Sequence, residues 1–140
     1  MDLQELVSRL RRIKEEKDRL NTEELVLSSP SITDLGKVGD IFELCKEAVK
    51  ESDPRSNPLS AANRRKSLFV ILYLFSPKTL AGGKMSLGLR NEVARVMNIS
   101  PSNVSHCYKN AWFFYEVYKD FREEVNDLFA RVFEKLKKNQ

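Results

Sequence analysis

One stretch of the sequence constrains the fold of this chain more than any other. Residues 89–111 read LRNEVARVMNISPSNVSHCYKNA, and their apolar residues have the spacing of two short helices that cross at a tight turn. Ala94 is small enough for a close crossing, and Ile99 suits the turn. The other apolar residues expected between the two helices are Val93, Met97, Val104 and Cys107. The spacing predicts a helix-turn-helix whose second helix turns its polar side outward.

The second helix of this unit has a clear start signal. Ser100 can accept a backbone N–H bond as the N-cap, and Pro101 fits the first helical position because it lacks an N–H. We expect the helix to run from Pro101 through at least Asn110. The early residues of such a helix reach base edges in the DNA major groove, where an asparagine can bond adenine bidentately. The candidate DNA-reading residues are Ser100, Ser102, Asn103, Ser105 and His106.

Two of these residues have a second interpretation. His106 could instead be partly buried and bonded to the backbone, and Asn103 could be an ordinary surface residue near a helix start. The sequence leaves both interpretations open.

Positive charge is concentrated around the same unit. The formal net charge is +4, yet residues 1–59 carry 10 basic and 13 acidic side chains. Residues 64–109 carry eight basic side chains and one acid, Glu92, and residues 110–140 carry six of each. Such a segment is suited to a polyanion, although a basic soluble surface is the plainer interpretation. The expected phosphate-contacting residues are Arg64, Arg65, Lys66, Lys84, Arg90 and Lys109.

The N-terminus predicts a heptad-like helix from Asp2 to about Leu20. Its apolar residues recur in alternating steps of three and four, interrupted by Lys17. They are Leu3, Leu6, Leu10, Ile13 and Leu20. A helix this short is marginal alone, so it packs either on its own chain or on a partner copy. Residues 21–33, which contain Ser28-Ser29-Pro30-Ser31, are expected to be a connection.

The rest of the chain predicts further helices and no strand. An apolar stripe indicates a helix from about Asp34 or Val38 to Glu51, and a proline-rich linker follows over residues 53–58. Another helix starts near Ser60 and ends at Ser76-Pro77. The aromatic stretch 112–138 forms a long helical tail, with a break where Asp120 would cap a new helix. The fold class expected is all-α with five to six helices, divided into an N-terminal accessory or oligomerisation region (1–59) and a helix-turn-helix DNA-binding domain (60–140).

Nothing in the sequence favours catalysis or a cofactor. One histidine and two cysteines cannot supply a four-ligand zinc site, and His106 and Cys107 diverge because they are adjacent on one helix. We therefore expect no enzyme activity, no metal and no cofactor. The chain shows no signal peptide, and its longest apolar run, residues 68–75, is too short to span a bilayer. These features predict a cytoplasmic protein without a membrane partner.

Residues 64–132 loosely resemble the C-terminal DNA-binding domain of the bacterial replication initiator DnaA. Val104, His106 and Lys109 stand where that family has valine, histidine and a base, and residues 118–125 (YKDFREEV) are similar to its tail. The family's Asp-His-Thr-Thr is Ser100-Pro101-Ser102-Asn103 here. The chain also resembles small DNA-binding proteins of phages and mobile elements, including terminase small subunits.

The apolar spacing, the capped second helix and the acid-poor basic surround together predict sequence-selective binding of double-stranded DNA, in regulation, replication or packaging. The heptad seam and the aromatic tail are the features through which a homo-oligomer is expected, by the N-terminal or the C-terminal helix. The alternative from another class is a helical protein-interaction or assembly module, in which the helix-turn-helix is only a packing unit.

Overall fold

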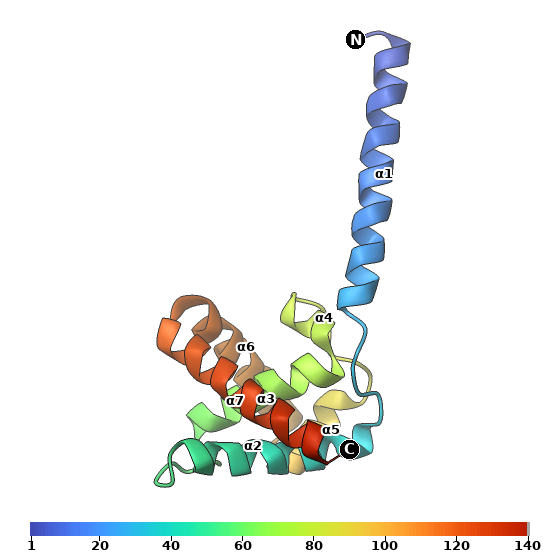
Figure 1. Cartoon of the computed structure of the whole chain (residues 1–140). Coiled ribbons are helices and arrows are strands. Elements are labelled where there is room, and N and C mark those ends of the chain that lie inside the picture. The colour runs from blue at the N-terminus through green and yellow to red at the C-terminus, as the bar shows by residue number, and fades with distance from the viewer. Residues whose placement is uncertain (140) are drawn as a thin grey trace.

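The chain is built from helices, with no strand in the described residues, 1–139 (Figure 1). The computed structural model contains seven α-helices and one short 3-10 helix in that range, and it confirms the all-α class. The elements are α1 (Leu3–Leu27), η1 (Leu35–Lys37), α2 (Val38–Ser52), α3 (Ala61–Phe75), α4 (Pro77–Leu80), α5 (Leu89–Met97), α6 (Pro101–Val117) and α7 (Lys119–Lys138).

The count of α-helices exceeds the predicted five to six because of α4. This single turn begins at Pro77, and the Ser76 and Thr79 hydroxyls share a buried hydrogen bond of 2.8 Å that stabilises it. The aromatic tail breaks within the predicted region, residues 118–121, but the predicted cap is wrong. The break falls at Tyr118, which is extended (φ −107°, ψ 113°), and Asp120 lies inside the first turn of α7. The prediction that Asp120 caps the last helix was therefore wrong.

The N-terminal helix is longer than predicted. It continues to Leu27, so the expected connection over residues 21–33 was wrong for its first seven residues. Helical contacts continue past Leu20: Arg19 pairs with Glu23 at 3.1 Å, and the Thr22 hydroxyl donates to the Asp18 carbonyl at 3.0 Å. The helix ends only at Ser28, just before Pro30.

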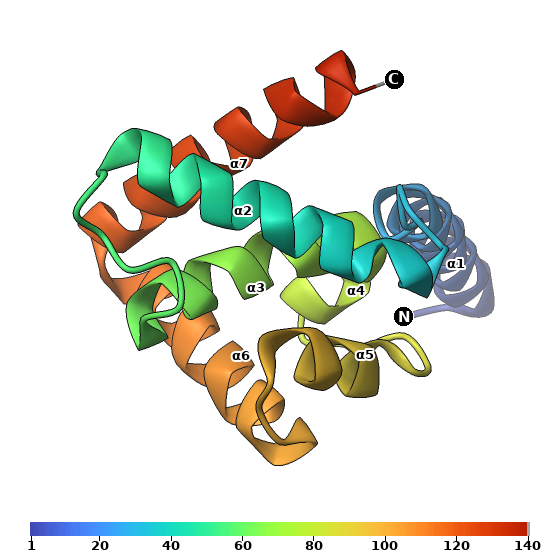
Figure 2. The same cartoon turned by 90° about the horizontal axis from the view of Figure 1, so that it is seen from below.

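Five helices contribute buried side chains to one interior: α2, α3, α5, α6 and α7. Helix α3 packs against α2, α4, α6 and α7, and α5 joins through α2 and α6 (Figure 2). Leu68, Ile71 and Leu72 of α3 are fully buried among them. The boundary predicted between residues 59 and 60 falls in the loop joining α2 to α3, and the helices on both sides of that loop belong to one core. Asn63 fixes this loop by donating to the Ser56 hydroxyl and the Asn57 carbonyl, each at 2.8 Å.

Helix α1 stands apart from this core. None of its residues is buried, and the helix projects away from the other helices with the N-terminus at its far end (Figure 1). At 1.5 Å per residue its 25 residues extend about 37 Å. The segment behind it is held to the core by the Ser31 and Ile32 amides, which donate to the Leu74 carbonyl at 2.9 and 3.0 Å. The structure therefore does not show α1 packing on its own chain.

Candidate nucleic-acid interface

The turn between α5 and α6 is fixed by its backbone. Asn98 adopts a left-handed conformation (φ 56°, ψ 48°), which asparagine tolerates better than most residues and which ends α5. The Ile99 amide then donates to the Ala94 carbonyl at 3.0 Å. The apolar residues expected between the two helices are buried or half-buried: Val93, Ala94, Met97, Ile99, Val104 and Cys107. Residues 89–111 thus contain α5, a tight turn and the first part of α6, which continues to Val117.

Helix α6 begins as the sequence predicts and is anchored further along. The Ser100 hydroxyl accepts from the Asn103 amide at 3.1 Å, and Pro101 occupies the first helical position. The Tyr108 phenol donates to the Thr79 carbonyl, and the Trp112 indole N–H donates to the Leu80 carbonyl at 3.3 Å. Both bonds tie α6 to α4, so the direction of α6 does not depend on its packing against α5 alone.

The outward side of α6 is polar. Ser102, His106 and Lys109 share one helical ridge and are exposed, Asn103 is exposed beside that ridge, and Ser105 is half-buried. Within residues 1–139 the side chains of these five residues make no hydrogen bond or ion pair with the protein. The structure thus shows His106 on the surface rather than bonded to the backbone. Ser100 differs, because its hydroxyl is occupied by capping α6.

Two arginines of α3 border this ridge on one side. Arg64 and Arg65 line a hollow together with Asn103, Cys107 and Asn110 of α6. The Arg65 guanidinium lies over the Phe114 ring, 4.8 Å from its centroid, which fixes the charge close to α6. No acidic side chain lines this hollow.

The loop before α5 borders the ridge on its other side. Lys84 and Arg90 line a second hollow with Ser105 and Lys109, again without an acidic side chain. The Ser86 amide donates to the Ser76 hydroxyl at 3.1 Å and holds this loop to the core. A side chain at Gly83 would come within 2.9 Å of the Lys78 carbonyl, so the loop needs glycine there.

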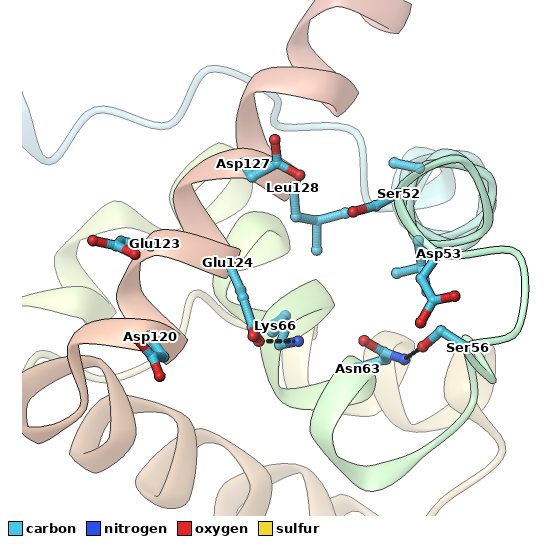
Figure 3. A pocket seen from close by; sticks show the side chains of 12 residues that line it. Ser52, Asp53, Ser56, Asn63, Lys66, Asp120, Glu123, Glu124, Asp127 and Leu128 are labelled. Atoms are coloured by element: carbon cyan, nitrogen blue, oxygen red, sulfur yellow. Dashed lines mark hydrogen bonds and ion pairs between the residues drawn. The ribbon is translucent and has the colours of Figure 1, made fainter.

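Lys66 lies elsewhere. Its ammonium pairs with Glu124 of α7 at 2.5 Å in a hollow between the α2–α3 loop and α7 (Figure 3). This hollow is acidic, and its carboxylates are those of Asp53, Asp120, Glu123, Glu124 and Asp127. The structure therefore gathers Ser102, Asn103, Ser105, His106, Lys109, Arg90, Lys84, Arg64 and Arg65 around α6 and separates Lys66 from them.

Two further polar residues belong to this surface. Asn110 lines the hollow of Arg64 and Arg65, and Asn91 lines the hollow of Lys84 and Arg90. Sequence reasoning missed both. The signal for Asn110 was its spacing of seven residues from Asn103, two helical turns further along the same side of α6.

Local electrostatics leave the surface around α6 positive. Glu92, the single acid in residues 64–109, is paired with Arg95 on α5, and the hydrogen bond from Arg95 lowers the pKa of the Glu92 carboxyl. Burial raises the pKa of the Cys107 thiol, an effect partly opposed by Arg65 and Arg64. The thiol is therefore neutral and does not offset the arginines beside it.

Comparison of the chain with protein-family models, curated proteins and solved structures found no match. The resemblance to the initiator family stays a prediction. Within residues 1–139, no three His, Cys, Asp or Glu side chains are grouped so that they could hold a metal ion. The same residues include no helix with the length and apolar character needed to cross a membrane.

Proposed function

We propose that this protein binds double-stranded DNA, with α5 and α6 acting as a helix-turn-helix and α6 entering the major groove. One observation carries the proposal: the polar ridge of α6 lies between two hollows, each lined by basic side chains and by no acid. The acidic hollow that holds Lys66 shows that the charges of this chain are sorted by face, because its carboxylates lie on α7 and the α2–α3 loop.

The two kinds of side chain have different roles in this proposal. Ser102, Asn103, Ser105 and His106 are free of protein partners and read base edges, because amides, hydroxyls and imidazoles pair with the donors and acceptors of the major groove. The flanking cations contact phosphates and set the register on the duplex. These cations are Arg64, Arg65, Lys84, Arg90 and Lys109. The protein acts in the cytoplasm without a cofactor, where its two free cysteines stay reduced.

The test is the salt dependence of binding to a mixed-sequence duplex, measured by fluorescence anisotropy. If all five cations contact phosphates, log K falls against log salt with a slope of about −4.5. In the double variant Arg90→Ala/Lys109→Ala, the slope of log K against log salt is expected to be shallower by about 2. Its matched control is Lys46→Ala/Lys50→Ala on α2, which removes the same charge from another helix and leaves the slope unchanged. The proposal is contradicted if the protein does not bind DNA at low salt. It is also contradicted if both double variants lose DNA affinity equally.

The assembly module remains the competing function, and the unpacked helix α1 is the observation in its favour. The two functions separate cleanly by experiment. Self-association with no DNA binding at about 50 mM salt identifies an assembly module, because phosphate contacts are strongest at low salt. Selection of bound sequences from a random duplex pool then tests sequence selectivity, since a DNA-reading α6 enriches a common motif.

A further inference from the structure

Helix α1 exposes an apolar seam that no other part of residues 1–139 covers. Five large aliphatic side chains recur along one side of the helix, and each is about half exposed or more. They are Leu3, Leu6, Leu10, Ile13 and Leu20. An isolated helix of this length is marginal in water, because most helical stability comes from packing of the apolar face. The seam therefore needs a partner.

The C-terminal helix does not offer a comparable seam. Helix α7 buries Phe121, Val125, Leu128 and Val132 within its own chain, and of its large apolar residues Phe133 alone is exposed among those described. Of the two terminal helices, α1 is therefore the one whose apolar seam is unused.

The seam of α1 follows a heptad register. Leu3, Leu10, Lys17 and Glu24 take the first core position (a), and Leu6, Ile13, Leu20 and Leu27 take the second (d). Arg9, Glu16 and Glu23 then flank the seam on one side (g), and Val7, Lys14 and Asn21 flank it on the other (e). A helix with an a/d seam and charged flanks is built to pair with another helix of the same kind, and the simplest such partner is a second copy.

A parallel pair of α1 helices places like charges together. Equal core positions face each other in that arrangement, so Lys17 meets Lys17 and Glu24 meets Glu24 across the seam. The flanking contact runs from Arg9 to the partner's Lys14, which is also repulsive. The charges of α1 disfavour this orientation.

An antiparallel pair removes these conflicts. Position a then faces position d, which gives layers of Leu3 with the partner's Leu20 and Leu10 with the partner's Ile13. Lys17 faces the partner's Leu6, where its aliphatic stem packs while the ammonium reaches water. Arg9 comes beside the partner's Glu16, with opposite charge, twice by symmetry. Glu23, which approaches the partner's Asp2, is already paired with Arg19 at 3.1 Å.

We propose that two copies of this chain pair through α1 in an antiparallel coiled coil, with Leu3 of one copy packed against Leu20 of the other. Residues 24–27 lie beyond the paired region, which leaves room for each helical core. The two Leu27 residues are about 46 Å apart along the common axis, so the cores lie at opposite ends of the dimer. The pairing does not depend on the proposed DNA contact, because no residue of α6 takes part.

Sedimentation equilibrium of the full chain tests whether this seam pairs the copies. The wild-type protein is expected to be a dimer, and Leu10→Glu is expected to make it a monomer. The matched control is Leu25→Glu, the same substitution on the same helix at an exposed position outside the seam, which leaves the dimer intact. A monomeric wild-type protein overturns the proposal, and so does a dimer that survives Leu10→Glu.

A charge reversal tests the orientation. In the antiparallel pair, Arg9→Glu converts two attractive contacts into repulsive ones and weakens the dimer about tenfold, and adding Glu16→Arg restores it. In a parallel pair, Arg9→Glu strengthens the dimer, because the new carboxylate would then face the partner's Lys14. A tighter dimer of the Arg9→Glu variant therefore overturns the antiparallel assignment.

Disulfide formation gives an independent reading of the same orientation. A mixture of Leu3→Cys and Leu20→Cys proteins is expected to cross-link between the two variants, with the sulfur pair identified by peptide mapping. Leu3→Cys alone is not expected to cross-link, because its two positions are about 26 Å apart in the antiparallel dimer. Efficient cross-linking of Leu3→Cys alone contradicts the proposal.

Discussion

The guanidinium group of Arg65 lies over the aromatic ring of Phe114, 4.8 Å from its centroid, and this contact joins α3 to α6. The planar guanidinium can stack on the ring and still direct N–H groups at a phosphate from its edge. A flexible side chain at this position would lose more conformational freedom on binding DNA. The contact therefore presents a positive charge beside α6 in a fixed place.

Replacing Arg65 by alanine is expected to weaken DNA binding several-fold and to make the salt slope shallower by about 1. The adjacent Lys66→Ala is the matched control, because Lys66 is paired with Glu124 on another face of the protein. Its DNA affinity is expected to equal that of the wild type. Fluorescence anisotropy titrations at several salt concentrations measure both. If Lys66→Ala loses more DNA affinity than Arg65→Ala, the DNA does not bind at the surface around α6.

Asn103 and Lys109 separate the reading of bases from the binding of phosphates. Asn103→Ala is expected to relax sequence preference at one base pair, with a discrimination loss of about 1–3 kcal/mol. Lys109→Ala is expected to lower the affinity for all duplexes by the same factor, because a phosphate contact carries no sequence information. Binding to the selected site and to single-base variants of it distinguishes the two. If neither substitution changes DNA affinity or sequence preference, α6 does not contact the DNA.

Local features of the candidate interface were predictable from the sequence. Ser100, Pro101 and Val104 act within one helical turn of each other, so their residue types and spacing are sufficient to predict the start of α6 and its buried side. Arg64 and Arg65 were also identified, although their approach to α6 depends on the packing of α3 rather than on spacing. Charge density along the chain placed both arginines in the basic segment, residues 64–109, without giving this geometry.

Contacts between distant residues were not predictable. Lys66 follows Arg65 in the chain, yet one residue along a helix turns a side chain by about 100°, and Lys66 meets Glu124 of α7 instead. The isolation of α1 is a property of the whole fold. Its apolar seam is equally compatible with packing inside the chain, and only the arrangement of the other helices shows that the core is complete without it.

The cap of α6 has a stability effect of its own. Ser100→Ala removes the acceptor of the Asn103 amide and is expected to lower the free energy of unfolding by about 1 kcal/mol. Ser102→Ala, at an exposed position inside the first turn, is the control and is expected to change it by less than about 0.5 kcal/mol. Urea denaturation measures both. If the free energy of unfolding falls by a comparable amount in the two variants, the Ser100 hydroxyl does not act as a cap.

The buried thiol of Cys45 is expected to lower the free energy of unfolding at alkaline pH. Burial raises the pKa of its thiol from 9.0 to about 12, so the folded protein keeps a proton that the unfolded chain releases. The free energy of unfolding is therefore unaffected by this group below pH 9. Above pH 9 it declines as pH rises, by at most about 1.4 kcal/mol per pH unit. Burial also raises the pKa of Tyr108, so the wild-type protein is compared with Cys45→Ala, which keeps Tyr108. In this variant the free energy of unfolding is expected to decline less between pH 9 and 10. An equal decline in both proteins contradicts this origin.

Removal of residues 1–28 tests how α1 and α6 divide their roles. Because no residue of α1 is buried, the truncated chain is expected to unfold at the same urea concentration as the Leu10→Glu monomer. Its affinity for a short duplex with one selected site is expected to equal that of the full chain, since the residues around α6 are intact. For a long duplex with two sites, the full-length dimer binds at least about tenfold more tightly, because its second core binds at high effective concentration. Titration of both duplexes with both proteins measures this difference, and a truncated chain that binds the one-site duplex more weakly would mean that α1 itself contributes to the DNA contact.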